Sequence, residues 1–316
     1  MTRRTLLATL VACGLLQAAW SVYSQTPRPP GQLRTEKVRD GLFMISGEGG
    51  NVAAYVTGDG VVLVDDMFDR NHADILAQVR SVTDRPVRYV FNTHQHDDHA
   101  GGDARMLPIA EVIAHRNARV NLVEKRQPFF EDTPGTPIGL PRLTFSDEAS
   151  VHLGGTEVRA IHFGRGHTNG DAVVYFPELR VVHTGDLFLV PRGPGRGGGQ
   201  TARPAGVPIF VDYAQGGSFN DWSVTLDRML ALDFDTVIPG HGPVSTRADV
   251  IRFRADLETM RNRLTSLVRE GTTKQVLVGI LERDYGWRAT GCPPAPPTPG
   301  CLQYQQVDAL IAELRR

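Results

Sequence analysis

Three histidines and two aspartates occur within the six residues His94 to His99, which read His-Gln-His-Asp-Asp-His. Imidazole nitrogens and carboxylate oxygens are ligands that zinc prefers, and two ions about 3.5 to 4 Å apart need roughly six or seven ligands, including a bridging carboxylate. His94 and His96 can project together from an extended turn, whereas Asp98 and His99 can face a second ion. Since the chain has only 10 histidines, chance is a poor explanation for this cluster, which predicts a two-metal site.

Three more candidate ligands stand alone in the sequence, each beside a glycine. They lie in the motifs Gly166-His167-Thr168, Thr184-Gly185-Asp186 and Pro239-Gly240-His241-Gly242. Asp171, four residues after His167, is a candidate for orienting a ligand, and Asp97 is expected to face solvent or a neighbouring loop. The other histidines lack such context and are expected to be structural: His72, His115, His152, His162 and His183.

Short β-rich runs and turns must position these side chains. Runs at 42–46, 53–57 and 61–66 predict consecutive strands at an antiparallel sheet edge. A helix over 71–82 leads into a strand over 87–92, so the histidine-rich segment directly follows a strand. Loops after strands are common places for catalytic residues.

The rest of the chain repeats this alternation and then changes to helices. We expect strands at 112–114, 157–163, 171–176, 181–184 and 236–238, with helices at 117–125 and 219–232. The glycine-rich stretch 191–208 predicts a flap or linker. Helices alone follow, at 249–270, 273–285 and 305–316. Two strand-rich halves suggest two similar half-domains packed sheet to sheet.

Taken in order, the four motifs resemble the metallo-β-lactamase superfamily, whose signature is His-x-His-x-Asp-His. The resemblance spans about residues 51–243. It implies an α/β fold, a four-layer αββα sandwich of two similar half-domains, here with a C-terminal helical extension. We therefore divide the chain into an export signal at 1–24, a catalytic domain at 25–247 and the extension at 248–316.

The resemblance also implies a ligand for each metal position. His94, His96 and His167 would hold a first ion. Asp98, His99 and His241 would hold a second, and Asp186 would bridge the two. We assign Asp98 as the catalytic residue as well as a ligand. The expected cofactor is a pair of Zn²⁺ ions, with iron or manganese as alternatives, and a shared hydroxide would be nucleophilic near neutral pH.

The expected function is zinc-dependent hydrolysis of a small-molecule carbonyl: an ester, lactone, thioester, amide or lactam. β-Lactamases of the best-known subclass carry a cysteine where Asp186 stands and a substrate-anchoring lysine where Leu189 stands, so only weak β-lactamase activity is expected. Arg192 and Arg196 are the nearest cations in sequence. The alternatives are a diiron oxidoreductase or oxygenase, a phosphodiesterase, and a binding protein with a relic site. The segment 212–222 either borders the pocket or caps a helix with a packed tryptophan.

Composition and the first residues bear on partners and location. The net charge is -1 with 22% charged residues and no basic stripe, so nucleic acid is not an expected partner. Arg3 and Arg4 precede an apolar stretch at 6–20, which predicts a cleaved export signal and a periplasmic or secreted protein. This region also resembles a twin-arginine signal, and the residues before Cys13 resemble a lipoprotein cleavage site. Membrane contact is expected only through this signal, and the oligomeric state is left open.

Two cysteines would remain after cleavage, Cys292 and Cys301, on either side of a proline-rich loop. In an oxidising compartment we expect them to form a disulfide. A metal-binding pair is the alternative.

Overall fold

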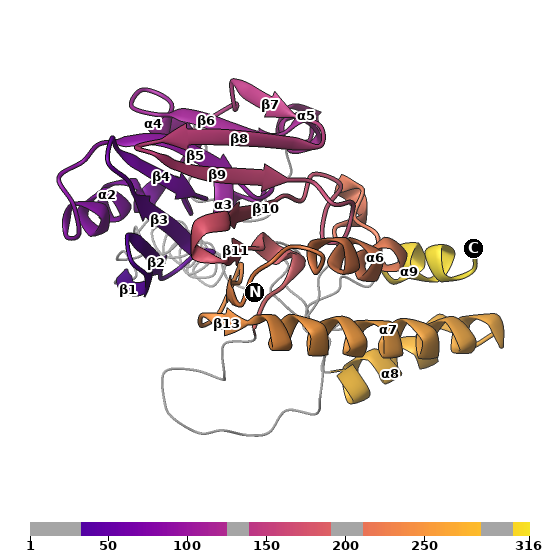
Figure 1. Ribbon diagram of the computed structural model, residues 1–316. Helices are drawn as coiled ribbons and strands as arrows, with labels where there is room; N and C mark the ends of the chain where they lie inside the picture. Colours follow the sequence, from indigo (N-terminus) through magenta and orange to yellow (C-terminus); the bar gives the residue numbers. More distant parts are fainter. Residues whose placement is uncertain (1–32, 125–138, 191–210, 286–305) are drawn as a thin grey trace, which may run out of the picture. The chain divides into compact units, whose positions relative to one another are not determined.

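Two β-sheets form the centre of the fold (Figure 1). The computed structural model describes residues 33–124, 139–190, 211–285 and 306–316. The predicted export signal, the whole glycine-rich stretch 191–208 and the two cysteines therefore lie outside the described residues. Within them the first sheet has seven strands in the order β1-β2-β3-β4-β5-β6-β7, and the second has six in the order β13-β12-β11-β10-β9-β8.

The first sheet begins with the predicted antiparallel strands and continues with parallel ones. Its strands are β1 (Arg34–Arg39), β2 (Leu42–Ser46), β3 (Val52–Val56), β4 (Val61–Val64), β5 (Val87–Asn92), β6 (Glu111–His115) and β7 (Leu143–Phe145). The sequence did not predict β1 or β7. Both are edge strands, and β1 is mostly charged and has no buried residue, so it lacks the apolar alternation that marks a strand.

The second sheet is antiparallel except where β11 runs parallel to β12. Its strands are β8 (Glu148–Leu153), β9 (Thr156–Ile161), β10 (Val173–Phe176), β11 (Val181–His183), β12 (Thr236–Ile238) and β13 (Ser245–Thr246). The two edge strands, β8 and β13, were not predicted. β8 buries only one residue, and β13 is two residues long.

Helices connect and cover the sheets. The α-helices are α2 (His72–Arg80), α3 (Asp97–Ala100), α4 (Asp103–Met106), α5 (Arg116–Glu124), α6 (Phe219–Met229), α7 (Arg247–Arg269), α8 (Lys274–Tyr285) and α9 (Gln306–Leu314). Short 3-10 helices are η1 (Asp69–Asn71), η2 (Pro177–Leu179), η3 (Gly185–Leu187) and η4 (Tyr213–Gln215). The longer helices match the predicted ranges within a few residues. None of the helices in the described ranges has both the length and the apolar composition that crossing a membrane requires.

The buried side chains form three layers, because successive residues of a strand point to opposite faces of its sheet. In β10, Val174 and Phe176 face the space between the sheets, whereas Val173 and Tyr175 face the helices outside. This alternation is the two-residue period of a strand. On the other side, Ile75 of α2 packs on the outer face of the first sheet. Helix, sheet, sheet and helix thus form the predicted αββα sandwich.

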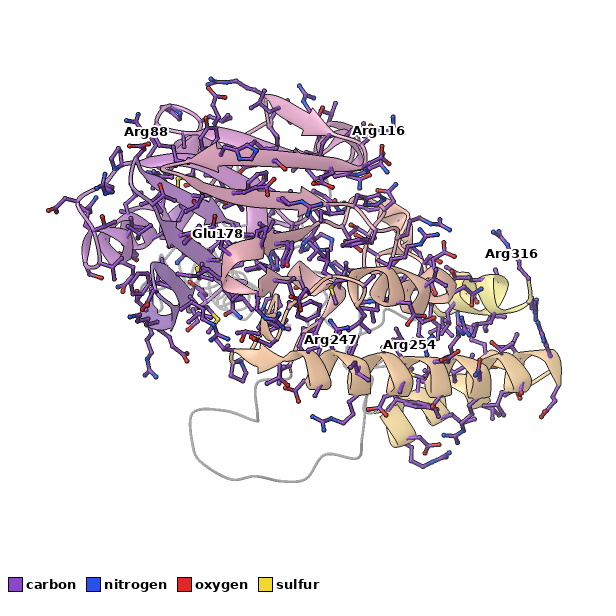
Figure 2. The ribbon with its side chains drawn as sticks, in the orientation of Figure 1. Arg88, Arg116, Glu178, Arg247, Arg254 and Arg316 are labelled. Atoms are coloured by element: carbon purple, nitrogen blue, oxygen red, sulfur yellow. The ribbon has the colours of Figure 1, made fainter. Side chains whose placement is uncertain are left out.

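The C-terminal helices extend the outer cluster of the second sheet. α7 buries residues three or four apart along one face: Val250, Phe253, Leu257, Met260, Leu264 and Val268. This spacing gives a single apolar stripe. Arg254, labelled in Figure 2, adds an ion pair to Asp227 of α6 at 2.7 Å. α9 inserts Val307, Leu310, Ile311 and Leu314 into the same cluster, so the extension shares a core with the second sheet.

We predict that Leu310→Ala lowers the free energy of unfolding by about 2 to 5 kcal/mol, because Leu310 is buried and its loss leaves a cavity. Chemical denaturation measures this change. Val276→Ala on α8 is the control, since Val276 is 55% exposed, and it should change stability by less than about 0.5 kcal/mol. Equal effects of the two substitutions would contradict the packing described for α9.

Candidate metal centre

The histidine-rich segment changes from extended backbone to helix. β5 ends at Asn92, His96 is still extended, and α3 begins at Asp97. The amides of His99 and Ala100 both donate to the His96 carbonyl at 2.9 Å, which closes the first turn. His94 and His96 therefore leave an extended segment, whereas Asp98 and His99 leave a helical turn. The expected strand end that turns into a helix is present.

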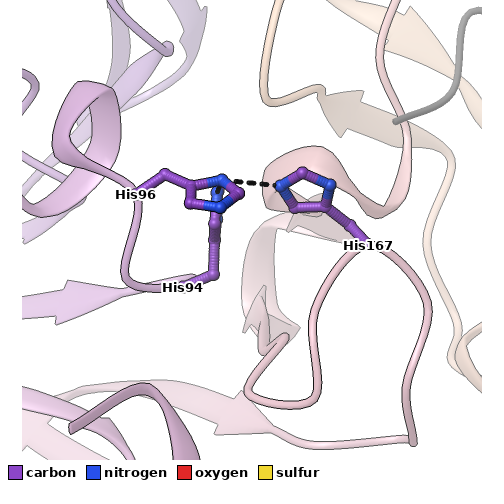
Figure 3. A group of neighbouring side chains, drawn as sticks. All are labelled: His94, His96 and His167. Atoms are coloured by element: carbon purple, nitrogen blue, oxygen red, sulfur yellow. Dashed lines mark hydrogen bonds between the residues drawn. The ribbon is translucent and has the colours of Figure 1, made fainter. Parts of the chain in front are cut away.

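The first group of side chains comes from both sheets. Figure 3 shows the rings of His94 and His167 pointing toward His96. His96 Nδ1 lies 3.1 Å from His94 Nε2 and 2.9 Å from His167 Nε2. All three residues are buried, and their ligand atoms lie within 4.8 Å of one another. These are the three residues expected to hold the first ion.

The second group contains Asp98, His99 and His241, with Asp186 beside it. His241 Nε2 lies 3.3 Å from Asp98 Oδ2 and 3.4 Å from Asp186 Oδ1. His99 Nε2 is 3.2 Å from Asp186 Oδ1. The other carboxylate oxygen of Asp186 is 3.7 Å from His167 Nε2. Asp186 thus lies between the two groups, where a bridging ligand would stand.

Close packing of backbone against Asp186 explains one glycine of the last motif. A β-carbon at Gly240 would collide with Asp186 Oδ1 and with the backbone of Gly185. The Gly240 amide also donates to the Gly185 carbonyl at 2.9 Å. The loop after β12 can therefore approach the loop after β11 only with glycine at this position, which brings His241 to the site.

Asp65 orients two of the histidines, one in each group. The His99 Nδ1–H donates to Asp65 Oδ2 at 2.7 Å. Thr93 Oγ1 donates to the same oxygen at 2.8 Å and lies 3.1 Å from His94 Nδ1. From this network we assign the Nδ1–H tautomer to the neutral form of both rings, the form that can bind a metal ion. The lone pairs of both Nε2 atoms then face the interior of the site.

Asp212 orients His96 through Nε2, not through Nδ1 as in the other two rings. Its Oδ2 lies 3.0 Å from His96 Nε2, so this ring presents Nδ1 to the interior. Three ring nitrogens, from His94, His96 and His167, thus converge at about hydrogen-bonding distance with no acid among them. A hydrogen bond between two of these nitrogens satisfies only that pair, whereas a cation between them would accept the lone pairs of all three. The donor set therefore fits a metal ion, and the buried Asp186 Oδ1, which lies 3.2 Å from His99 Nε2 and 3.4 Å from His241 Nε2, fits a second ion in the same way.

The structure corrects the role expected for Asp171. Its carboxylate accepts hydrogen bonds from the Thr168 amide and hydroxyl and touches none of the ligand rings in the described residues. It holds the turn after His167. The orienting carboxylates, Asp65 and Asp212, were missed. Asp65 had one local signal, its place directly after a buried strand, and it adopts a positive φ of 62°, which aspartate tolerates better than most residues.

The remaining sequence predictions have plain outcomes. Trp222 is fully buried and donates to the Leu187 carbonyl at 2.9 Å, and Ser218 caps α6. The reading of 212–222 as a helix cap with a packed tryptophan is correct for those two residues. Asp97 is half-buried. The histidines expected to be structural belong to none of the ligand groups found in the described residues.

Charges within the site shift several pKa values. Burial opposes protonation of His99, but Asp186, Asp98 and Asp65 outweigh it and raise the pKa of His99 well above its usual value. Burial likewise opposes protonation of His241, yet Asp186 and Asp98 raise its pKa to about 9. For His94 the acidic neighbours do not outweigh burial, so burial lowers its pKa well below the usual value. Burial would raise the pKa of Asp186, but His241 and His99 hold it well below its usual range.

Comparisons with known proteins agree with the fold. The family model of the metallo-beta-lactamase superfamily matches residues 45–241, a range that contains all the candidate ligands. The metallo-beta-lactamase from Pontibacter korlensis has a similar structure, with a TM-score of 0.56 and 20% identity over 72% of this chain and 99% of that chain. At this identity the likeness concerns the fold.

Two curated relatives carry different names. The 2,4-dinitroanisole O-demethylase subunit alpha of Nocardioides sp. (strain JS1661) is 27% identical over 232 residues, which cover 72% of this chain and 62% of the relative. Metallo-beta-lactamase type 2 of Bacillus sp. (strain 170) is 27% identical over 195 residues, which cover 60% of this chain and 66% of the relative. The chain thus spans less than two thirds of the length of either relative.

We predict that Asp65→Asn weakens metal binding by about 10- to 100-fold, as expected when the partner of a ligand ring is lost. Asparagine tolerates the left-handed backbone but cannot accept at both oxygens. Titration with Zn²⁺ against a competing chelator measures the affinity. Asp59→Asn is the control, since Asp59 is exposed in the β3–β4 turn. Unchanged affinity in Asp65→Asn would contradict the orienting role.

Chelator-treated protein should become less stable as the pH rises. Protonated His241 favours the folded state because its pKa is raised from 6.5 to about 9. This contribution is fully present below pH 6.5 and is lost as the pH passes about 9. Melting temperatures at pH 6.5, 8 and 9.5 should therefore fall, and His241→Gln should reduce the slope. His152→Gln, at an exposed site, should leave it unchanged, and a flat profile in the parent chain would refute the charge arrangement.

Proposed function

Because this chain belongs to the metallo-beta-lactamase superfamily, we propose that it is a dinuclear metal-dependent hydrolase that adds water across a carbonyl bond of a small molecule. The substrate classes are esters, lactones, thioesters and amides, lactams included. The observation that carries the proposal is the convergence of five histidines and two aspartates in one buried site, with the outward nitrogens of His94, His96 and His99 held by Thr93, Asp212 and Asp65.

Zinc is the metal we propose for both positions. Imidazole and carboxylate are common zinc ligands, while iron and manganese accept the same ligands. Two bound divalent ions would supply a hydroxide nucleophile near neutral pH and a positive site for the oxyanion of the attacked carbonyl. The chain's own contribution is to fix ligand atoms before substrate arrives, through the hydrogen bonds that orient the rings of His94, His96 and His99.

Asp98 is the residue we propose for catalysis. Burial would raise the pKa of its carboxyl, but His99 and His241 lower it below its usual value. Asp98 therefore stays ionised at neutral pH and can accept a hydrogen bond from a reacting water. Its backbone is also fixed, because its carbonyl accepts from the Gly50 amide at 2.9 Å.

We propose that β-lactams are poor substrates. Asp186 occupies the place of the cysteine found in the best-known β-lactamases, and the position expected to anchor the lactam carboxylate holds Leu189. Leu189 is buried and uncharged, so it offers no cation. Arg192 and Arg196 lie outside the described residues. The β-lactamase name of one relative supports testing this class.

Export, a periplasmic or secreted location and the lack of a nucleic-acid partner stay predictions from sequence. We propose that the enzyme acts on its small-molecule substrate after export, on the basis of Arg3, Arg4 and the apolar stretch that follows them.

A substrate panel tests the proposed reaction. Protein reconstituted with Zn²⁺ is assayed on an ester, a lactone, a thioester, a β-lactam, a phosphodiester and a nitroaryl methyl ether, the last because one relative is named for such a substrate. We expect turnover of at least one carbonyl class, loss of turnover with chelator, and recovery with Zn²⁺. Turnover of only the phosphodiester or the ether would refute the carbonyl assignment. Activity that needs iron and an electron acceptor would establish the redox alternative.

Substitution of the ligands tests the site. Asp98→Ala and His167→Ala should each lower kcat/KM by at least about 100-fold, because each removes a ligand and leaves the metal misplaced. Metal analysis of the purified variants should show less than two ions per chain. His152→Ala, whose side chain is 74% exposed, is the matched control. Two ions and full activity in the Asp98 and His167 variants would show that the ligand assignment is wrong.

A further inference from the structure

Glu313, near the end of α9, makes an unusual number of contacts with the loop before α6. Its Oε2 accepts from the Tyr213 hydroxyl at 2.8 Å and from the Phe219 amide at 3.1 Å. Its Oε1 accepts from the Ser218 hydroxyl at 2.6 Å and from the Asn220 amide at 3.3 Å. One carboxylate thus accepts hydrogen bonds from two hydroxyl groups and two backbone amides. The two amides belong to the first turn of the 11-residue helix α6, where backbone N–H groups lack partners within the helix.

The helix that carries Glu313 is firmly anchored. Val307, Leu310, Ile311 and Leu314 are all buried in the outer core, and α9 packs against α6, α7 and α8. In Figure 1 α9 lies beside α6. The backbone is joined as well, since Asn220 Nδ2 donates to the Glu313 carbonyl at 3.2 Å. Glu313 therefore acts from a rigid support.

The loop that Glu313 grips also touches the first metal group. Asp212 directly precedes Tyr213, and its Oδ2 orients His96 at 3.0 Å. Its amide donates to the His167 carbonyl at 2.8 Å, so one residue contacts two candidate ligands. The Gln215 side chain also accepts a hydrogen bond from the side chain of Gln95, which stands between His94 and His96 in the sequence.

Glu313 holds both ends of this loop. Tyr213 lies beside Asp212 at its start, and Ser218 lies at its end, where it caps α6. Between them, Asp212 Oδ1 accepts from the Gln215 amide at 3.1 Å, and the Gly217 amide donates to the Asp212 carbonyl at 2.8 Å. A shift of about 1 Å in this turn would break the contact between Asp212 and His96, because a hydrogen bond weakens steeply beyond its normal range.

We propose that Glu313 is a positioning residue for the metal centre. Its hydrogen bonds to Tyr213 and Ser218 fix the position of Asp212, and Asp212 in turn orients the ring of His96. The C-terminal helix is then a working part of the site and not only a packing element. This inference rests on the proposed metal function, since it concerns affinity at the first ion.

Metal titration of matched variants tests the inference. Co²⁺ binding to chelator-treated protein is followed by its visible absorption for the parent chain, Glu313→Gln, Tyr213→Phe and Asp212→Asn. We expect Asp212→Asn to weaken the first site by about 10- to 100-fold, and the Glu313 and Tyr213 variants by a smaller factor of about 3 to 10. Asp308→Asn is the control, because Asp308 lies on the same helix and pairs with Lys274 at 2.7 Å, away from the loop. It should bind Co²⁺ like the parent chain.

Hydrogen exchange of the metal-free chain provides a second measurement that does not depend on activity. The amides of Asp212, Gln215 and Gly217 should exchange several-fold faster in Glu313→Gln and Tyr213→Phe, while amides of α7 keep their parent rates. Glu313→Gln replaces one of the two acceptor oxygens by an NH2 donor, and Tyr213→Phe removes one donor to the same carboxylate. Because both changes act on one set of contacts, their effects on affinity should be less than additive in the double variant.

The outcomes separate this inference from the proposed function. If the parent chain binds two ions and the Glu313 and Tyr213 variants match Asp308→Asn in affinity and in exchange, Glu313 has no positioning role. If the parent chain binds no ion, the proposed metal centre fails and the inference fails with it. Faster exchange throughout α7 in Glu313→Gln, with no loss of affinity in Tyr213→Phe, would show a general effect on stability and overturn the inference.

Discussion

The convergence of candidate ligand atoms in one buried space is the constraint on which this structure depends. Nitrogens of His94, His96 and His167 converge at about 3 Å, and two carboxylates stand beside them. Such an arrangement is costly without cations, since buried polar atoms need partners. Surrounding groups therefore hold the ligands in place, as Asp65 and Asp212 do for their rings. A cation bound between them would offset this cost, so metal binding would be coupled to folding.

The two sheets share the task of building the site. The first supplies His94, His96, Asp98 and His99 after β5, and the second supplies His167, Asp186 and His241 after β9, β11 and β12. Asn51 joins the two at this place. Its side chain donates to the carbonyls of Pro239 and Gly242 at 2.8 and 2.9 Å, and its amide donates to the Gly240 carbonyl at 2.7 Å. The packing of the sheets thus fixes the distance between the ligands that the first sheet supplies and those that the second sheet supplies.

Sequence predicted what is encoded locally. The spacing of His94, His96, Asp98 and His99 is local, and so is the glycine beside each isolated ligand, so all the candidate ligands could be named and are found together. Strands with apolar alternation were also predictable. Asp212 and Glu313 were not, because their partners lie 116 residues away (His96) and 100 residues away (Tyr213), and no local pattern marks such contacts. Asp171 was a candidate for orienting a ligand because it is near His167 in sequence, but its carboxylate accepts from Thr168 within its own turn.

The division of ligands between distant parts of the chain also shapes how the protein reaches its folded state. His94 and His241 are separated by 241 minus 94, or 147 positions, and closing so long a loop is slow. The four ligands from His94 to His99 need no such closure, so they can chelate an ion while the chain is still unfolded. An ion held there would stabilise the unfolded chain too and would subtract from the stability that metal would give the folded one. With the proposed metal centre, folding in excess metal would therefore be a competition between an early, incomplete chelate and the full site.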